Sequence, residues 1–300
     1  MKVIIVGGVA GGASAAARIR RLDENAEIIV FERTGFISYA NCGLPYYIGG
    51  VITDKKELTL QNPESFWNRF RVNMLVRHDV TAINTDRKTV TVHELDTGKT
   101  YEESYDKLIL SPGAKPIRPN IPGTDNKNIF TLRTVEDTLK IHKYIETKKP
   151  NKATIIGGGF IGMEAGENLA YLGIDVTLVQ RSTHLLPPFD FDMACILHTE
   201  MKNHGVNLML NTEITEIAEK DEHLLLKTAD NCELQSDMVL FAIGVMPDTA
   251  LAKDAGIKLG IKGSIIVNDR METSVSDIYA VGDAVEIMNF VTKNKDHIAL

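Results

Sequence analysis

Two stretches of the chain share one pattern of apolar and small residues. Residues 2–6 form a β-branched run that leads through a glycine-rich turn into the small-residue run 13–22, which predicts a strand followed by a helix. A second apolar strand is predicted at 27–31. A strand, a tight turn, a helix and a parallel strand together form the βαβ unit of a dinucleotide-binding fold.

The same order of elements returns about 150 residues later. The pattern predicts a strand at 153–156, a helix at 163–172 that stops at Gly173, and a strand at 175–179. Similarity at a fixed offset indicates two copies of one structural plan.

The repeat extends beyond the βαβ units. Residues 72–75 and 80–83 resemble residues 206–209 and 214–217, and each pair precedes alternating strands and a closing apolar run, at 106–110 and at 237–242. We therefore predict an α/β fold of two Rossmann-like dinucleotide-binding domains, each with a parallel sheet and a β-meander insertion. The turn-rich run 111–123, which holds four prolines, predicts the crossing between the domains.

The two glycine-rich turns are candidate phosphate cradles. Bare backbone can approach a pyrophosphate closely, and amides at the start of a helix can bind it. The first turn has Val9 where the motif G-x-G-x-x-G has its middle glycine, whereas the second turn matches in full. Two such turns, each between a strand and a helix, favour nucleotide binding over ligand-free turns. The expected residues are Gly7, Val9, Ala10, Gly11 and Gly12 in the first cradle and Gly157, Gly159, Phe160, Ile161 and Gly162 in the second.

The residues that follow the second strand of each copy differ. Glu32, followed by Arg33, lies twenty positions after Gly12 and suits the ribose diol of FAD or NAD. Gln180 and Arg181 include no acid, and the guanidinium can accept a ribose 2′-phosphate. The second site is therefore expected to favour NADPH, with NADH as the alternative and a merely solvated arginine as a third interpretation.

Composition excludes several classes of function. The net charge of −7 argues against a broad basic surface for nucleic acid, and no apolar run reaches the roughly 18 residues of a membrane span. We expect a cytoplasmic protein that binds neither nucleic acid nor a membrane. Three widely spaced cysteines form no disulfide framework or CxxC site, and the histidines lack ligand spacing, so no metal site is expected.

Cys42 has a distinctive setting among the cysteines. It shortly precedes Pro45, which suits the first turn of a helix, and the partial positive charge of a helix N-terminus favours a thiolate. A buried structural cysteine is the alternative. Cys195 and Cys232 have no such setting and are expected to be structural.

The two glycine motifs, the turn 105–114 and the late stretch 273–284 resemble the pyridine nucleotide-disulfide oxidoreductases over essentially the whole chain. The resemblance implies a discontinuous FAD domain (1–115 plus 246–300) and an NAD(P)H domain (116–245). It places Asp283 at the ribityl chain of FAD; without it, Asp283 would predict a helix N-cap. The other cofactor residues expected are Ser111, Gly113 and Gly282 for FAD, Gly244 for the nicotinamide half, and Glu164 near flavin and nicotinamide. Glu164 is alternatively a first-turn glutamate that complements the helix dipole.

The cysteine motif 41–47 is similar to the coenzyme A-disulfide reductase branch of this family. Familiar members carry C-x4-C, but Tyr47 occupies the position of the second cysteine, so no internal disulfide can form. The resemblance implies that Cys42 cycles between a thiolate and a mixed disulfide with coenzyme A (CoA), which is reduced by NADPH through FAD. It also implies CoA contacts at Ser14, Arg18, Arg21, Ser38 and Asn41. Arg18 and Arg21 share a helix face and can pair with phosphates, although a solvated basic face is the alternative.

Other functions stay open at this point. The same thiol could serve an NADH oxidase or peroxidase through sulfenic acid, or a polysulfide reductase. An FAD-dependent electron-transfer reductase of a partner protein, or a non-catalytic nucleotide-binding module, would leave Cys42 structural. The apolar end at 297–300 predicts a chain that stops before the family's C-terminal interface domain. We therefore expect little turnover from these 300 residues alone and a homodimer for the longer protein.

Overall fold

The computed structural model describes residues 1–299. Leu300, the last residue of the apolar run 297–300 and of the expected FAD domain, lies outside the described residues. The chain divides into two compact units. The first unit comprises residues 1–39, 59–115 and 245–299, and the second unit comprises residues 40–58 and 116–244.

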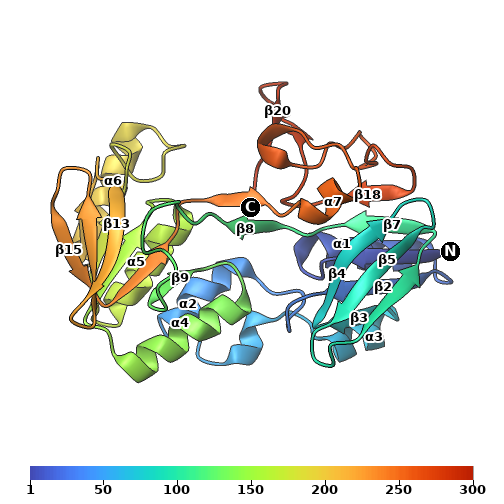
Figure 1. Cartoon of the computed structure of the whole chain (residues 1–300), viewed down its shortest axis with the longest axis horizontal. Coiled ribbons are helices and arrows are strands. Elements are labelled where there is room, and N and C mark those ends of the chain that lie inside the picture. Colours follow the sequence, from blue (N-terminus) through green and yellow to red (C-terminus); the bar gives the residue numbers. More distant parts are fainter. Residues whose placement is uncertain (300) are drawn as a thin grey trace. The chain divides into compact units, whose positions relative to one another are not determined.

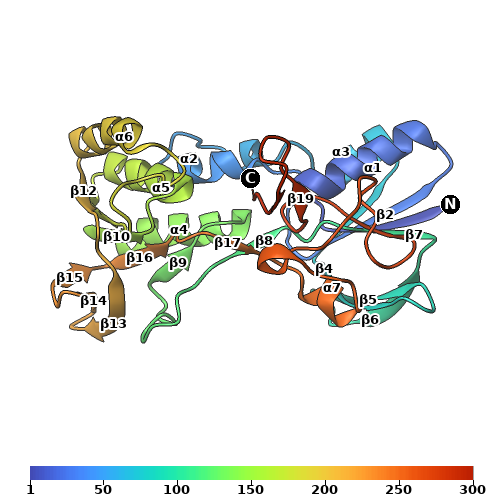
Figure 2. The same ribbon diagram turned by 90° about the horizontal axis from the view of Figure 1, so that it is seen from above.

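The first unit is built on a five-stranded parallel sheet with the order β18-β7-β1-β2-β3. Helices cover one face of the sheet, while a three-stranded meander and a short helix cover the other (Figure 2). The strands are β1 (Lys2–Val6), β2 (Glu27–Glu32), β3 (Asn73–Val76), β7 (Lys107–Leu110) and β18 (Ile278–Ala280). The covering elements are α1 (Ala10–Leu22) and α3 (Pro63–Phe70) on one face, and β4 (His78–Asn84), β5 (Thr89–Glu94), β6 (Thr100–Ser104) and α7 (Ala250–Asp254) on the other.

The alternation of side chains along β1 shows why both faces need cover. Val3 and Ile5 pack into the cluster beneath α1 and α3, whereas Ile4 packs into the cluster beneath the meander. All three are almost completely buried, as expected for a parallel sheet that is covered on both sides. The smaller elements near this unit are β8 (Ala114–Pro116), which pairs with β17 (Val245–Pro247), the turn η3 (Ile261–Gly263), and the hairpin of β19 (Ile287–Met288) and β20 (Lys295–Asp296).

The second unit repeats this plan with the strand order β12-β11-β10-β16-β9, again parallel. Its strands are β9 (Ile129–Thr131), β10 (Lys152–Ile156), β11 (Asp175–Val179), β12 (Val206–Met209) and β16 (Met238–Phe241). Its helices are η1 (Asn41–Gly43), α2 (Leu44–Ile48), η2 (Lys55–Leu58), α4 (Val135–Lys148), α5 (Phe160–Tyr171) and α6 (Phe191–Asn203), and its meander is β13 (Ile214–Lys220), β14 (His223–Thr228) and β15 (Glu233–Ser236). The predicted fold class is confirmed.

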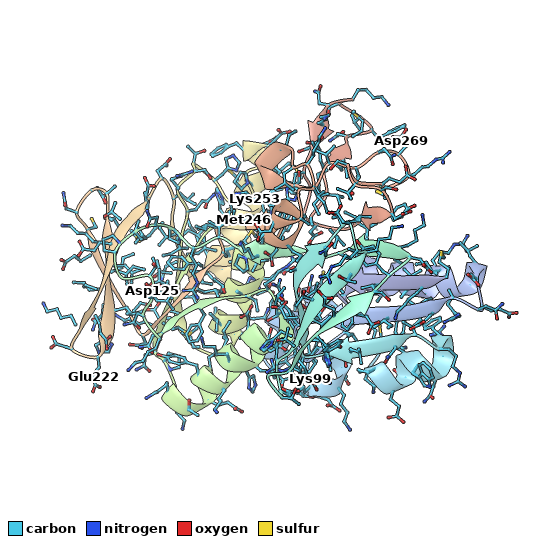
Figure 3. The ribbon with its side chains drawn as sticks, turned by 45° about the vertical axis from the view of Figure 1, so that its right-hand side comes forward. Lys99, Asp125, Glu222, Met246, Lys253 and Asp269 are labelled. Atoms are coloured by element: carbon cyan, nitrogen blue, oxygen red, sulfur yellow. The ribbon has the colours of Figure 1, made fainter. Side chains whose placement is uncertain are left out.

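The two meanders occupy equivalent places in the repeat. In the chain, the first meander lies between β3 and β7, and the second lies between β12 and β16. Figure 3 labels Lys99 in the second turn of the first meander, between β5 and β6, and Glu222 in the first turn of the second meander, between β13 and β14. An aspartate also precedes each closing strand: Asp106 accepts a hydrogen bond from the Lys2 amide (2.6 Å), and Asp237 accepts one from the Lys152 amide (3.0 Å). The closing strands therefore begin one residue later than predicted, at 107 and 238, because these carboxylates bind the first strand of each sheet.

Residues 40–58 belong to the second unit, although they were expected in the FAD domain 1–115. Tyr47 on α2 packs against His142 on α4, with ring centroids 5.0 Å apart. The backbone at Gly49 lies against α5, where an added Cβ would come 2.2 Å from Asn168 Oδ1. Figure 1 shows α2, in light blue, among α4 and α5 in green. The nucleotide assigned to each domain stays a prediction.

Helices α1 and α5 begin three residues earlier than predicted, at Ala10 and Phe160. Glycine disfavours helix interiors, so the pattern placed each helix start after the last glycine of its turn. In the structure, that glycine lies inside the first helical turn. A Cβ on Gly12 would come 1.8 Å from the Gly7 carbonyl oxygen, and a Cβ on Gly162 would come 2.0 Å from the Gly157 carbonyl oxygen. Close packing of helix on turn therefore overrides local propensity.

Candidate functional site

The first glycine turn meets two other segments, at Ser111 and at Gly282, at the carboxyl ends of the first sheet. Gly7 has a φ of +99°, and an added Cβ would lie 2.1 Å from the Ser111 carbonyl oxygen. A Cβ on Gly11 would lie 2.5 Å from Ser111 Oγ, and one on Gly282 would lie 3.5 Å from the same oxygen. In open α/β sheets, ligands bind at this edge. The expected residues Gly7, Gly11, Ser111 and Gly282 therefore lie together around one bare stretch of backbone.

Glu32 is buried at the end of β2, with only 6% of its surface exposed. Its Oε2 accepts a hydrogen bond from the Gly8 amide (2.7 Å), and its Oε1 accepts one from the Thr34 amide (2.8 Å). A carboxylate can accept more than one bond at each oxygen, so Glu32 can also accept bonds from ribose hydroxyls. Arg33 is half-exposed and forms an ion pair with Asp248 (2.5 Å).

The turn that holds Asp283 is supported by a histidine. No helix follows Asp283 within residues 1–299, so its interpretation as an N-cap is wrong. His297 is buried and its Nε2 donates a hydrogen bond to the Asp283 carbonyl oxygen (2.7 Å). Sequence reasoning treated His297 only as part of the apolar end, because the carbonyl that it contacts lies fourteen positions earlier.

The second glycine turn is more open at one position. Gly157 has a φ of +113°, and an added Cβ would lie 2.3 Å from the Ala242 carbonyl oxygen. By contrast, no atom lies within 4 Å of the position of a Cβ on Gly159. The space in front of Gly159 is therefore free for a ligand rather than filled by protein.

A cleft of about 720 Å³ lies at the carboxyl ends of the second sheet. Gln180 contributes to it and pins the glycine turn: its Oε1 accepts a bond from the Gly158 amide (3.0 Å), and its Nε2 donates to Ser182 Oγ (2.5 Å). Gly244, with a φ of +112°, also lines the cleft. Expected residues that line the cleft are Gly157, Gly159, Gln180, Arg181 and Gly244, whereas Phe160, Ile161, Gly162 and Glu164 do not line it.

The charged residues of the cleft are Arg181 and Glu213, as far as the described chain shows. Arg181 is 81% exposed, and its Nη1 lies 3.6 Å from Glu213 Oε1. Sequence reasoning missed Glu213, because it lies in the loop after β12 with no motif around it. Phe160 is exposed and its ring meets that of Phe189 at a T-shaped angle.

Cys42 is exposed and lies in the single turn η1, directly before α2. Pro45 occupies the first turn of α2, as predicted, but this helix has only five residues. Exposure excludes the alternative of a buried structural cysteine for Cys42. Cys195 is half-buried, and exposed Cys232 lies in the meander.

The Tyr46 phenol interacts with Cys42 and with two carboxylates of α5, Glu164 and Glu167. Burial raises the pKa of Tyr46, and the charges of Glu164, Glu167 and Cys42 raise it further. Burial also raises the pKa of Glu164, and the charge of Glu167 adds to this. Glu164 lies in the second turn of α5, because the helix begins at Phe160, so the interpretation as a first-turn glutamate is wrong. Asn41 Oδ1 is buried and accepts no hydrogen bond from any described residue.

The expected CoA contacts of the first unit lie mainly on α1. Ser14, Arg18 and Arg21 are exposed at positions that share one helix face. The neighbouring Arg20 has a structural role instead, since its guanidinium donates to five backbone carbonyls, those of Asp23, Glu24, Ala26, Phe70 and Arg71. Ser38 has a φ of +48°, and its amide donates to the Gly8 carbonyl (3.0 Å).

Neither a metal-binding cluster nor a membrane-spanning helix occurs among the described residues 1–299. Residues 1–299 contain no group of three or more histidines, cysteines or carboxylates that could hold a metal ion. Over the same range, no helix combines the length and the apolar character needed to cross a membrane.

Comparison with known proteins places these features in context. The model of the family described as pyridine nucleotide-disulphide oxidoreductase matches residues 1–297. A coenzyme A disulfide reductase of Staphylococcus epidermidis is 40% identical over 284 residues, which is 95% of this chain and 63% of the relative. The chain thus spans less than two thirds of the length of this curated relative.

Two solved structures share the fold over the whole chain. Reduced CoADR-RHD of Bacillus anthracis superposes with a TM-score of 0.97 at 50% identity, and this chain covers 54% of it. An NAD-dependent persulfide reductase from A. fulgidus superposes with a TM-score of 0.95 at 34% identity, and this chain covers 56% of it.

Proposed function

Because the chain belongs to the pyridine nucleotide-disulphide oxidoreductase family, we propose that it binds FAD and NAD(P)H and reduces coenzyme A disulfide through Cys42. The observation that carries this proposal is the exposed thiol of Cys42 in the turn before α2, beside Tyr46. A thiol in this position, in a chain with two glycine cradles, can join nicotinamide oxidation to disulfide reduction. The name of the Staphylococcus epidermidis relative supports the choice of substrate.

The residues of the first unit fit FAD. Added side chains at Gly7 or Gly11 would collide with Ser111, so the bare backbone there suits a pyrophosphate. The buried carboxylate of Glu32 suits the adenosine ribose, and the turn at Asp283 suits the ribityl chain. The residues that would hold FAD are Gly7, Val9, Ala10, Gly11, Gly12, Glu32, Ser111, Gly113, Gly282 and Asp283. Arg33 is left out of this set because it pairs with Asp248.

The residues of the second unit fit a nicotinamide dinucleotide. The open space in front of Gly159 suits the pyrophosphate, and the cleft of about 720 Å³ has the size of a cofactor site. Arg181 lies at the end of β11, where the ribose 2′ position of a bound dinucleotide falls in this fold. NADPH and NADH are both candidates, because Arg181 attracts a 2′-phosphate and Glu213 opposes it.

Cys42 performs the exchange step in this proposal. Its thiolate attacks one sulfur of coenzyme A disulfide, a bond forms between Cys42 and that CoA, and the second CoA leaves as a thiolate that takes up a proton. When bound, FAD supplies a carrier for two electrons between the nicotinamide and the mixed disulfide. Two electrons and one proton convert the mixed disulfide into the Cys42 thiolate and free CoA, so the cycle is balanced.

Tyr46, beside Cys42, and Glu164, beside Tyr46, are the groups proposed for proton transfer. The raised pKa of Glu164 means that this carboxyl keeps its proton to a higher pH than an exposed glutamate does. It is the group of this cluster that we propose as the proton donor to the leaving CoA thiolate. The raised pKa of Tyr46 keeps the phenol neutral and available as a hydrogen-bond donor. The buried Oδ1 of Asn41 is an acceptor for a donor group of the substrate.

The residues proposed for the CoA moiety are those that the family resemblance indicates. Arg18 and Arg21 are exposed on one face of α1 and can bind its phosphates, with Ser14 beside them. Ser38 and Asn41 complete the proposed set. A homodimer in the cytoplasm is part of the same proposal.

A second candidate substrate is a persulfide or polysulfide. The A. fulgidus persulfide reductase superposes on the whole chain, and a single nucleophilic thiol can also attack a sulfur chain. An oxidase or peroxidase would use the same thiol through sulfenic acid.

The mass of the intact protein tests these proposals. Protein purified without reductant is denatured and weighed before and after reduction, beside a Cys42→Ser variant. We expect one disulfide-linked CoA that reductant removes and that Cys42→Ser lacks. Cys195→Ser and Cys232→Ser serve as matched controls and should keep the adduct.

Each other result supports a different function. Added sulfur atoms on Cys42 favour a persulfide or polysulfide as the substrate, and one added oxygen atom favours an oxidase or peroxidase function. An unmodified thiol, together with full reduction of a partner protein by Cys42→Ser, contradicts every thiol-based mechanism.

A further inference from the structure

Glu213 is held beside Arg181 by the backbone rather than by chance contact of two flexible side chains. The loop after β12 returns along the end of β11 and is tied to it by three hydrogen bonds. The Gln180 amide donates to the Met209 carbonyl (2.8 Å), the Thr212 amide donates to the Gln180 carbonyl (3.0 Å), and the Asn211 amide donates to the Ser182 carbonyl (3.0 Å). The residue that follows Thr212 is therefore fixed next to the residue that follows Gln180.

The electrostatics of this end of the cleft depend on one pair. Gln180 is neutral, and both ends of its amide are engaged, by Gly158 and by Ser182. Arg181 and Glu213 carry the charges of the cleft lining in the part of the chain that the structure describes. Their side chains are 81% and 55% exposed, so both are accessible to a ligand.

We propose that Glu213 determines how strongly the cleft selects between nucleotides with and without a ribose 2′-phosphate. The carboxylate occupies the guanidinium of Arg181 and repels a dianionic phosphate placed at the same position. The pair therefore lowers the selectivity that Arg181 alone would provide. This inference rests on the proposed function of the cleft as a nicotinamide dinucleotide site.

Binding of two adenosine fragments tests the inference without catalysis. Calorimetry with 2′,5′-ADP and 5′-ADP at low ionic strength gives the dissociation constants for the purified chain. We expect Glu213→Gln to tighten 2′,5′-ADP about fivefold and to change 5′-ADP by less than about twofold. Arg181→Gln should weaken 2′,5′-ADP, and the double variant should lose the gain of Glu213→Gln because no guanidinium is released.

Matched variants separate the local effect from general charge and from folding. Glu216→Gln removes another exposed carboxylate, on β13 and outside the cleft lining, and should leave both constants unchanged. Thermal unfolding of each variant checks that the fold is intact. If both fragments bind and Glu213→Gln changes their dissociation constants equally, or changes neither, the proposed role of Glu213 is overturned while the dinucleotide site stands. If neither fragment binds the unaltered chain, the dinucleotide site itself fails.

Discussion

The two units solve one structural problem with different residues. In the first unit the Gly8 amide donates to the carboxylate of Glu32 (2.7 Å), and in the second the Gly158 amide donates to the side-chain carbonyl of Gln180 (3.0 Å). Pinning the glycine turn requires only a buried acceptor at the end of the second strand. The charge of that acceptor is thus free to suit the ligand, which separates the role in folding from the role in recognition.

The middle position of the turn differs as well. Val9 has a side chain where the second unit has Gly159, which faces open space. Both turns nevertheless keep the first glycine. Gly7 and Gly157 have positive φ, and each lies against the carbonyl oxygen of a residue that follows the neighbouring strand of the sheet, Ser111 or Ala242. Packing against protein is therefore the shared constraint, and approach to the ligand differs between the units.

Alanine at the first glycine of either turn, Gly7 or Gly157, should have the largest effect on nucleotide binding, and each substitution should affect only the unit that holds it. Gly7→Ala should weaken FAD binding by at least roughly 100-fold, because its Cβ collides with Ser111 and its φ strains a side chain. Gly157→Ala should abolish binding of 5′-ADP and leave the flavin content unchanged. Flavin absorbance and calorimetry measure the two effects. Gly98→Ala, with φ +72° and nothing within 4 Å, is the control for strain alone, and loss of both nucleotides in either cradle variant would contradict independent sites.

Exchange of the two acceptor residues, Glu32 and Gln180, tests whether their charge determines which nucleotide each unit binds. Gln180→Glu should shift the ratio of 5′-ADP to 2′,5′-ADP affinity about tenfold toward 5′-ADP, because an acid favours a free ribose diol. Glu32→Gln should weaken FAD by a similar factor, since an amide NH₂ would face the Thr34 amide as donor against donor. Both affinities are measured by titration. An unchanged ratio in Gln180→Glu would show that this residue does not face the ribose.

The ends of the two cradle helices predict a smaller effect on stability. Helix α1 ends where Arg20 binds five carbonyls, whereas α5 is followed by Gly173 in a left-handed conformation (φ +81°). Arg20→Met should lower the free energy of unfolding by about 2 kcal/mol, and Gly173→Ala by about 1 kcal/mol. Urea denaturation measures both. Arg18 is exposed on the same helix, and Arg18→Met should change the free energy of unfolding by no more than about 0.5 kcal/mol. A larger loss in Arg18→Met would contradict a specific stabilising role for Arg20.

The smallest expected effect is on the pH dependence of stability. Hydrogen bonds from Lys107 and then Lys88 lower the pKa of Asp277 to about 2, from an ordinary value of 3.8. Its stabilisation is therefore complete above about pH 4 and is lost as pH falls toward 2. In the second unit burial opposes the shift, but amide donors and His223 outweigh it and lower the pKa of Asp237. Melting temperatures of Asp277→Asn should fall less steeply with acid than those of the unaltered chain; equal slopes would contradict the prediction.

Particular residues show where sequence reasoning stopped. The glycine turns, the strands around them and the position of Pro45 could be predicted because each depends on neighbours within a few residues. Arg33 was expected to contact the cofactor, yet its partner Asp248 lies 215 positions later in the chain. Glu213 had no local signal at all, because its importance comes from a loop that returns to Arg181.

Local sequence pattern was enough to predict the repeated βαβ plan, the two bare-backbone turns and the position of Cys42 before a helix, since periodicity and residue type act locally. Long-range packing places residues 40–58 on α4 and α5, and it starts the helices before the last glycine of each turn. It also makes Arg181 face Glu213. These features depend on contacts between segments far apart in the chain, where packing and hydrogen bonding outweigh local propensity.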